Sequence, residues 1–321
     1  MTTIHDDYPH PVPPIAQLRW KENYFFIIMG IEQNVHGIVH LNFEPGHDRA
    51  RFSCHLSVRG QQQKYVNETR FPAEFAMTRA VGDGTIALKF LEPHARFNLT
   101  LATTDFSFDL TFTKARPTFD FGACRYAAPE LPSFQEVMTL GMNLPYNHQQ
   151  QAMNISGTVK TRESGELRIS GWGYRDHSWC MRTDGAVASH TWSALHFGTR
   201  AFGVKKLQTL SRPGLWAREG YVSDDAGERV LRAIEVTYEG QSADGLPQRV
   251  RYDLADVLGG KYTIVADVQG RHAQVPLIAE KPGPHGAYNI TENFCPCVLE
   301  ETGEKGCALV EIGSGTKQVT A

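Results

Sequence analysis

The sequence has few cysteines and no long apolar run. Six cysteines occur in 321 residues, too few and too scattered for the disulfide framework of a small secreted domain. No apolar stretch approaches the length of a membrane-spanning helix. The segment 1–14 carries acidic, histidine and proline residues but lacks the apolar core of a signal peptide. We therefore expect a cytoplasmic protein with free thiols and no membrane insertion.

An excess of charge of one sign is also missing. The chain has 32 Lys and Arg against 35 Asp and Glu, a formal net charge of −3. A nucleic-acid-binding protein usually shows a basic excess or a basic stripe, and no run of Lys and Arg occurs here. The sequence contains no glycine-rich phosphate loop, no P-loop lysine and no G-x-S-x-G elbow. We expect no nucleic-acid partner and no nucleotide cofactor.

Helical patterns are scarce, whereas strand patterns occur along the whole chain. Between residues 105 and 113 apolar and polar side chains alternate strictly, which is typical of a half-buried strand. Short runs of this kind recur between glycine-containing turns, and only 134–142 suggests a short helix. The pattern predicts an all-β sandwich or barrel.

The middle of the chain holds the densest group of chemically active side chains. Residues 171–182 contain guanidinium groups, a carboxylate, an imidazole, a hydroxyl and two indoles. In an extended strand, successive side chains point to opposite faces. One face would carry Arg175, His177 and Trp179, and the other Tyr174, Asp176 and Ser178. A purely structural alternative is a buried Arg–Asp ion pair at a strand end.

This central segment resembles a family signature. Residues 171–179 read G-W-G-Y-R-D-H-S-W, similar to the G-x-G-x-R-D-H-S-W signature of the carotenoid-hydratase and kievitone-hydratase-like proteins. Residues 146–150 and 155–159 resemble the segment that precedes the signature, and 288–292 and 306–311 resemble the closing strands of that superfamily. The resemblance covers most of the chain, and the signature is its specific part.

The resemblance implies a fold and a class of ligand. It predicts two lipocalin-like antiparallel β-barrel domains packed together, with very little helix. The expected divisions are an extended lead-in over 1–14, a first domain over 15–185 and a second over 186–321. The implied ligand is a terpenoid, steroid, polyketide or other hydrophobic small molecule in an apolar cavity.

The same resemblance gives candidate site residues. His177 and Trp179 occupy signature positions that line the hydratase cavity. From the chemistry of the side chains, we expect His177 to transfer or position a proton and Asp176 to orient a partner. Arg175 would favour the ionised form of Asp176. Tyr174 is expected to contribute to substrate binding together with Trp179.

The chain departs from the superfamily pattern in two places. Cys180 stands where glycine is common, and no Asp or Glu occurs between residues 190 and 208, where these hydratases use an acidic residue. Other acidic residues are therefore candidates for a proton donor. They are Glu235, Asp253, Glu292 and Glu311, of which Glu311 is best placed because its neighbours at 308–312 are apolar.

A second group of candidates follows the signature. By alternation His190, Trp192 and His196 share one face of a strand, and we expect them to bind substrate. If this strand were the antiparallel neighbour of the signature strand, His177 and Trp179 would lie beside it. Ordinary core histidines are the structural alternative. A zinc centre formed by the three histidines lacks any diagnostic spacing, so we expect no metal.

Together these features predict a cofactor-free enzyme of the lyase or isomerase type that acts on a hydrophobic small molecule. Hydration, dehydration and isomerisation all need a placed proton-transfer group. One alternative is a pericyclase in the same barrel, where shape and aromatic surface matter and acid strength does not. Another is a non-catalytic carrier of lipophilic ligands.

Overall fold

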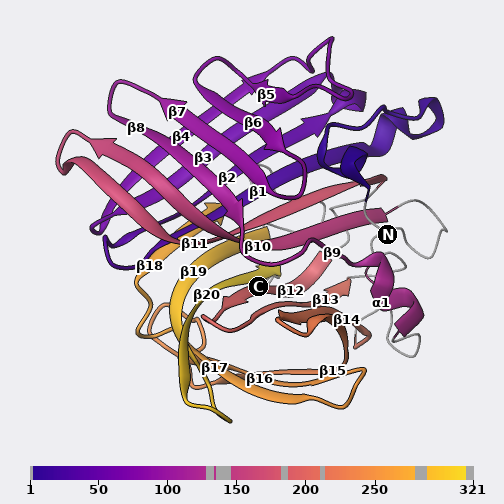
Figure 1. The fold of residues 1–321 in the computed structure, drawn as a ribbon, viewed down its shortest axis with the longest axis vertical. Coiled ribbons are helices and arrows are strands. Elements are labelled where there is room, and N and C mark those ends of the chain that lie inside the picture. Colours follow the sequence, from indigo (N-terminus) through magenta and orange to yellow (C-terminus); the bar gives the residue numbers. More distant parts are fainter. Residues whose placement is uncertain are drawn as a thin grey trace, which may run out of the picture. The chain divides into compact units, whose positions relative to one another are not determined.

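The chain forms an all-β protein, as the alternating patterns predict (Figure 1). The computed structural model describes residues 3–127, 134, 146–181, 187–209, 214–278 and 288–315. The chain divides into two compact units, Met1–Asp120 with Leu144–Arg182, and Phe121–Asn143 with Thr183–Ala321. Within the described ranges, no helix has the length and apolar character needed to cross a membrane.

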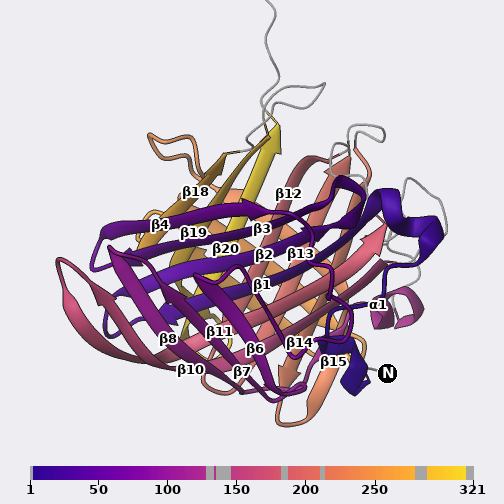
Figure 2. The ribbon, with the colours of Figure 1, turned by 90° about the horizontal axis from the view of Figure 1, so that it is seen from above.

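The first unit is built on one antiparallel sheet of eleven strands. Its order is β4-β3-β2-β1-β11-β10-β8-β7-β6-β5, with β9 paired to β10, so β4 and β5 form the edges of a half-barrel. Figure 2 shows β1, β2 and β3 side by side across it. The strands are β1 (Trp20–Gly30), β2 (Val35–Glu44), β3 (Arg49–Val58), β4 (Gln61–Thr69), β5 (Ala80–Gly82), β6 (Ile86–Glu92), β7 (Arg96–Ala102), β8 (Phe106–Lys114), β9 (Phe119–Asp120), β10 (Tyr146–Thr161) and β11 (Gly165–Met181).

Alternation explains how this sheet forms its core. On β8, Phe106, Phe108, Leu110 and Phe112 are buried, and the polar residues between them are more exposed. These rings join a large cluster of buried side chains from β1, β2, β3, β6 and β7 on one face of the sheet. Burying apolar area contributes about 25 cal/mol per Å², so this face supplies most of the stabilisation of the unit.

The N-terminal lead-in is less extended than predicted. It contains two 3-10 turns, η1 (Ile4–Asp7) and η2 (Pro14–Arg19), and a third, η3 (Pro45–His47), follows β2. Prolines start η2 and η3, where a missing backbone N–H costs nothing. The turn η1 ends at Asp7, whose carboxylate is fully buried in the first unit.

The second unit is a closed barrel. Its sheet order is β17-β16-β15-β14-β13-β12-β20-β19-β18, and an additional β17–β19 pairing closes eight strands into a ring. The elements are α1 (Gly122–Ala127), β12 (Val187–His196), β13 (Ala201–Thr209), β14 (Trp216–Asp224), β15 (Gly227–Glu239), β16 (Arg249–Asp256), β17 (Lys261–Asp267), β18 (Ala273–Ile278), β19 (Tyr288–Leu299) and β20 (Glu304–Gly315). Closure removes the unpaired edges that an open sheet exposes.

Several sequence-based expectations can be placed on this fold. All six cysteines are buried free thiols, as predicted. Of the helix expected over 134–142, only residue 134 belongs to the described residues, and the expected domain boundary between 185 and 186 lies outside them. The helix α1 precedes the expected boundary but belongs to the second unit, so the two units are not divided at a single position.

The signature strand β11 is central in the first sheet, paired with β1 on one side and β10 on the other. A Cβ atom on Gly171 would lie 2.3 Å from the carbonyl oxygen of Met29, and one on Gly173 2.7 Å from that of Ile27. Real side chains essentially never approach backbone so closely. The two glycines of the signature therefore allow β11 to lie against β1.

The expectation that β11 and β12 pair is wrong. β12 pairs with β13 and β20 in the second sheet. His177 and Trp179 therefore do not share a strand pair with His190 and Trp192. Because β11 is already paired on both edges, with β1 and β10, β12 belongs to another sheet.

Candidate functional site

The predicted alternation along β11 is present in the structure. Arg175 and His177 lie opposite Phe26 and Tyr24 of β1, which belong to the core of the half-barrel. Every residue from 173 to 180 is buried. β11 therefore carries a guanidinium and an imidazole on the apolar face of the sheet, where unpaired polar groups are costly.

Arg175 is neutralised by a residue far away in the sequence. Its Nη1 donates to Asp7 of η1, and both side chains are fully buried. Asp7 also accepts from the backbone N–H of His94, and Arg175 lies over the ring of Phe97 at 5.0 Å. The alternative of a buried Arg–Asp pair is thus realised, but with Asp7 in place of the neighbouring Asp176. This pair anchors the N-terminal segment on the half-barrel.

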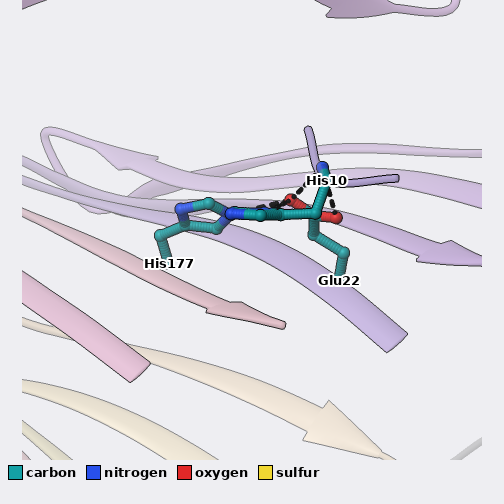
Figure 3. Close-up of side chains that lie close together, drawn as sticks. All are labelled: His10, Glu22 and His177. Atoms are coloured by element: carbon teal, nitrogen blue, oxygen red, sulfur yellow. Dashed lines mark hydrogen bonds and ion pairs between the residues drawn. The ribbon is translucent and has the colours of Figure 1, made fainter. Parts of the chain in front are cut away.

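His177 belongs to a second buried polar cluster, centred on Glu22 of β1 (Figure 3). Oε1 of Glu22 lies 2.9 Å from Nε2 of His177 and 2.9 Å from Nδ1 of His10. The phenol of Tyr24 donates to the same oxygen at 3.1 Å. The backbone N–H of His10 donates to Oε2 at 3.0 Å. Glu22 thus accepts from four donors on three residues.

Electrostatics fixes the protonation states of this cluster. Burial raises the pKa of Glu22, but the hydrogen bonds with His10 and His177 outweigh burial, so its pKa lies below the ordinary value. Burial lowers the pKa of His177, and Glu22 opposes this shift only in part. An ionised Glu22 beside a neutral His177 requires that Nε2–H donates. Nδ1 then carries the lone pair, and among the described residues it has no hydrogen-bond partner.

Aromatic rings enclose the two imidazoles. Tyr24 stacks on His177 with centroids 4.1 Å apart, and His10 stacks on Trp179 at the same centroid distance. Trp179 also lies 4.6 Å from the ring of His177. Ring faces of this kind stabilise positive charge by about 0.5–2 kcal/mol. A cation formed beside His177 would therefore be stabilised.

The cluster could also hold a metal ion. One ligand atom each of His10, Glu22 and His177 lies within 4.8 Å of the others. Two imidazoles and one carboxylate form a ligand set that zinc accepts. The same atoms already satisfy one another through N–H donors, so no ion is needed to explain the geometry. In the three-histidine set considered above, His190 and His196 belong to the other sheet.

The other face of β11 forms a separate network. Asp176 accepts from Nε2 of His148 and, at 2.8 Å, from the amide of Gln150, both on β10. It therefore orients His148, on the face of β11 opposite to His177. Tyr174, on the same face, is fully buried. The structure separates the predicted catalytic residues into three groups: Arg175 with Asp7, His177 with Glu22, and Asp176 with His148.

The candidates on β12 share one face, as alternation predicts. Trp192 and His196 are buried, and His190 is partly buried. His190 bonds through Nε2 to Glu311 of β20 and through Nδ1 to the phenol of Tyr288 of β19. These contacts lie within the second unit. The predicted residues thus fall into two centres, one in each unit.

Comparison with known proteins gives the chain a family. A family model described as a domain of unknown function, DUF7064, matches residues 3–315. The chain belongs to the DUF7064 family. No curated protein sequence matches it.

Solved structures share the fold of this DUF7064 protein at low sequence identity. Kievitone hydratase from Nectria haematococca is 13% identical with a TM-score of 0.64, over 98% of this chain and 93% of that one. CghA is 10% identical with a TM-score of 0.64, over 98% and 95%. An AttH-like protein from Nitrosomonas europaea is 14% identical with a TM-score of 0.62, over 93% of each chain. These structures share the predicted fold of two antiparallel β domains.

Sequence reasoning missed three residues of the DUF7064 site. Asp7 and Glu22 lie 168 and 155 positions before their partners Arg175 and His177. Like His10, they meet the signature through the β1–β11 pairing and the N-terminal segment. One signal was present for Glu22. It alternates with Tyr24 and Phe26 in the apolar run of β1, and a carboxylate on a buried strand face needs a partner.

Proposed function

We propose that this DUF7064 protein is a cofactor-independent enzyme of the lyase or isomerase type, acting on a hydrophobic small molecule. The observation that carries the proposal is the Glu22–His177 pair. Glu22 holds the imidazole in one tautomer, and the Nδ1 lone pair is buried beside aromatic rings. A base oriented by a carboxylate in this way is suited to removing a proton from an apolar substrate.

The reaction that fits best is the removal of water from an alcohol or the shift of a double bond. A hydroxyl protonated by a separate acid would leave as water and take the electron pair of its C–O bond. Nδ1 of His177 would take a proton from the neighbouring carbon, and the C–H electron pair would form the new double bond. Trp179 and Tyr24 would stabilise the positive charge that develops at the carbon that loses the hydroxyl. Resemblance to the fold of kievitone hydratase supports this class of reaction without identifying the substrate.

In this proposal the other predicted residues position the site or bind substrate. Arg175 fixes the N-terminal segment, and with it His10, over the site through its bond to Asp7. Asp176 positions β10 through His148 and Gln150. Tyr174, His190, Trp192 and His196 stay predictions as substrate-binding residues. No nucleic-acid partner is proposed.

The test begins with mass spectrometry of lipophilic molecules that co-purify with the full chain. Their structures then guide assays of terpenoid and steroid alcohols and alkenes for the gain or loss of one water. His177→Gln should lower turnover by about 100-fold or more with ligand binding retained. His36→Gln, a buried histidine on β2 outside the cluster, serves as the control.

Other outcomes assign the alternatives. A severalfold fall in His177→Gln, on a substrate that cyclises without change of mass, would indicate a pericyclase. Tight binding of a lipophilic ligand without any turnover by the unsubstituted protein would indicate a carrier. Full hydratase or dehydratase activity in His177→Gln would contradict the assignment of His177.

A further inference from the structure

A group of four polar side chains lies on the closed barrel, outside the site around His177. β20 runs between β12 and β19, and Glu311 of β20 is the cross-strand partner of both Trp192 and Glu292. The preceding residue Val310 belongs to the core of the barrel. Because successive side chains of a strand point to opposite faces, Glu311 lies on the outer face of the barrel wall.

Three members of the group form a hydrogen-bonded chain. His190 bonds through Nδ1 to the phenol of Tyr288 and through Nε2 to Oε1 of Glu311. The rings of His190 and Tyr288 stack with centroids 5.6 Å apart. Since both nitrogens of His190 are engaged, a proton that enters at one nitrogen can leave at the other.

Glu292 continues this chain. Its side chain is fully buried, and no N–H or O–H group of the described residues donates to either of its oxygens. Glu311 is its partner across the strand pair, and the carboxyl of Glu311 acts on Glu292 through charge and hydrogen bonding. Two ionised carboxylates are acceptors only, so they can bond to each other only if one carries a proton. If Nε2–H of His190 donates to Oε1 of Glu311, Glu311 is the ionised partner and Glu292 is the one that carries the proton.

The surroundings favour the protonated form for independent reasons. Burial comes first, and the negative charge of Glu311 comes second; together they hold the pKa of Glu292 well above its ordinary value. The exposure of the side chains to solvent falls along this hydrogen-bonded chain. The side chains of His190 and Glu311 are 13% and 16% exposed, whereas Glu292 is fully buried. The hydrogen-bonded side chains therefore connect a partly exposed histidine to a buried acid.

We propose that Glu292, Glu311, His190 and Tyr288 form a proton-donating site on the second unit, with Glu292 as the acid and the other three as the route that reloads it. Its substrate class is a neutral lipophilic alcohol or alkene. The O–H bond of Glu292 breaks, and its proton goes to a hydroxyl oxygen that leaves as water, or to an alkene carbon. A proton passed from Nε2 of His190 through Glu311 then restores Glu292, and a proton from solvent, passed through the phenol of Tyr288 to Nδ1, reloads His190.

The identity of the reaction rests on the proposed function, whereas the presence of the proton does not. A lyase that removes a carbon-bound proton with His177 must also protonate the departing hydroxyl. In the cluster around His177, Glu22 is ionised because its pKa is lowered, so it does not supply this proton. A neutral carboxyl such as that of Glu292 is the kind of group that donates a proton in such a reaction.

The first experiment measures the proton directly. Infrared spectra of the full chain at neutral pH should contain the carbonyl band of a protonated carboxyl, and Glu292→Gln should remove it. Glu300→Gln, which alters an exposed carboxylate paired with Arg251, should leave the band unchanged. A spectrum without the band, or a band that survives in Glu292→Gln, would overturn the proposal.

The second experiment measures turnover on a substrate found among terpenoid and steroid alcohols and alkenes. Glu292→Gln should lower turnover by about 100-fold or more. His190→Gln should move the acidic limb of the pH–rate profile, a change that loss of packing alone would not produce. Full turnover in Glu292→Gln would overturn the catalytic role. If the unsubstituted protein turned over no substrate while the band was present, the proposed function would fail and the protonated acid would stand.

Discussion

The two units each hold a His–Glu pair, and the two pairs differ in what surrounds the carboxyl groups. In the first unit Glu22 is surrounded by donors from His10, Tyr24 and His177, so it is ionised although fully buried. In the second unit, Glu292 has another carboxyl as its neighbour and keeps its proton. Burial raises the pKa of both groups, and the neighbours decide the outcome.

This difference implies different sensitivity to substitution. A carboxylate held by several donors leaves unpaired donors and buried charge behind when it is changed. A neutral carboxyl is replaced by an amide of nearly the same shape with little loss. Similar residue types therefore give a charge-paired centre in one unit and a buried, protonated carboxyl in the other. The predictions that follow use substitutions that separate these two states.

The largest effect is expected where a full charge loses its partner. Arg175→Met leaves Asp7 buried without its guanidinium, which should lower the free energy of unfolding by about 3–5 kcal/mol. Urea denaturation measures the loss. Arg168→Met, an exposed arginine on the same strand, is the control. Adding Asp7→Asn should restore part of the stability, and a loss below about 1 kcal/mol in the single variant would refute the pairing argument.

A smaller but still large effect is expected at Glu22. Glu22→Gln should cost about 3 kcal/mol at neutral pH, because the amide places donors against the donors of His10 and His177. A carboxyl with a lowered pKa stabilises the fold above its ordinary pKa, and this stabilisation disappears as pH falls through the folded value. The loss should therefore shrink in acid. Glu32→Gln, in an exposed turn, should show no such trend.

Strand character and the two faces of a strand could be predicted from the sequence because they depend on residues that are neighbours in the chain. Alternation identified the strand character and the two faces of β11, and the two glycines of the signature mark a close approach to β1. The all-β class followed from the same signal. Strand pairing did not, since which strands meet depends on contacts between distant segments. The wrong pairing of β11 with β12 arose in this way.

The candidate site illustrates the same limit. His177 was chosen from its own segment, but its partner Glu22 lies on β1 and the acid candidate Glu292 lies on β19. Glu311 was preferred among the acidic residues because of its apolar neighbours. The structure shows it as the acceptor of His190, and the cross-strand register brings Glu292 to it. The protonation state of a residue depends on such neighbours in space, and a local sequence pattern does not show which distant residues these are.

The smallest effect near the ordinary carboxyl pKa, and the sharpest dependence on pH, is expected for Glu292→Gln. Its stability relative to that of the unsubstituted protein should change sign with pH. Below the ordinary carboxyl pKa both folded and unfolded Glu292 carry a proton, so the glutamine should be neutral or slightly destabilising. As pH rises, the unfolded chain releases its proton while the folded protein keeps it, and the unsubstituted protein loses stability.

The difference should grow in favour of Glu292→Gln by at most about 1.4 kcal/mol per pH unit, the value for one proton. Urea denaturation of both proteins between the ordinary carboxyl pKa and neutral pH measures it, with Glu300→Gln as an exposed control. A difference that does not depend on pH would mean that folded Glu292 ionises normally. Because Gln cannot release a proton, a rising difference reports the proton that Glu292 retains in the folded barrel.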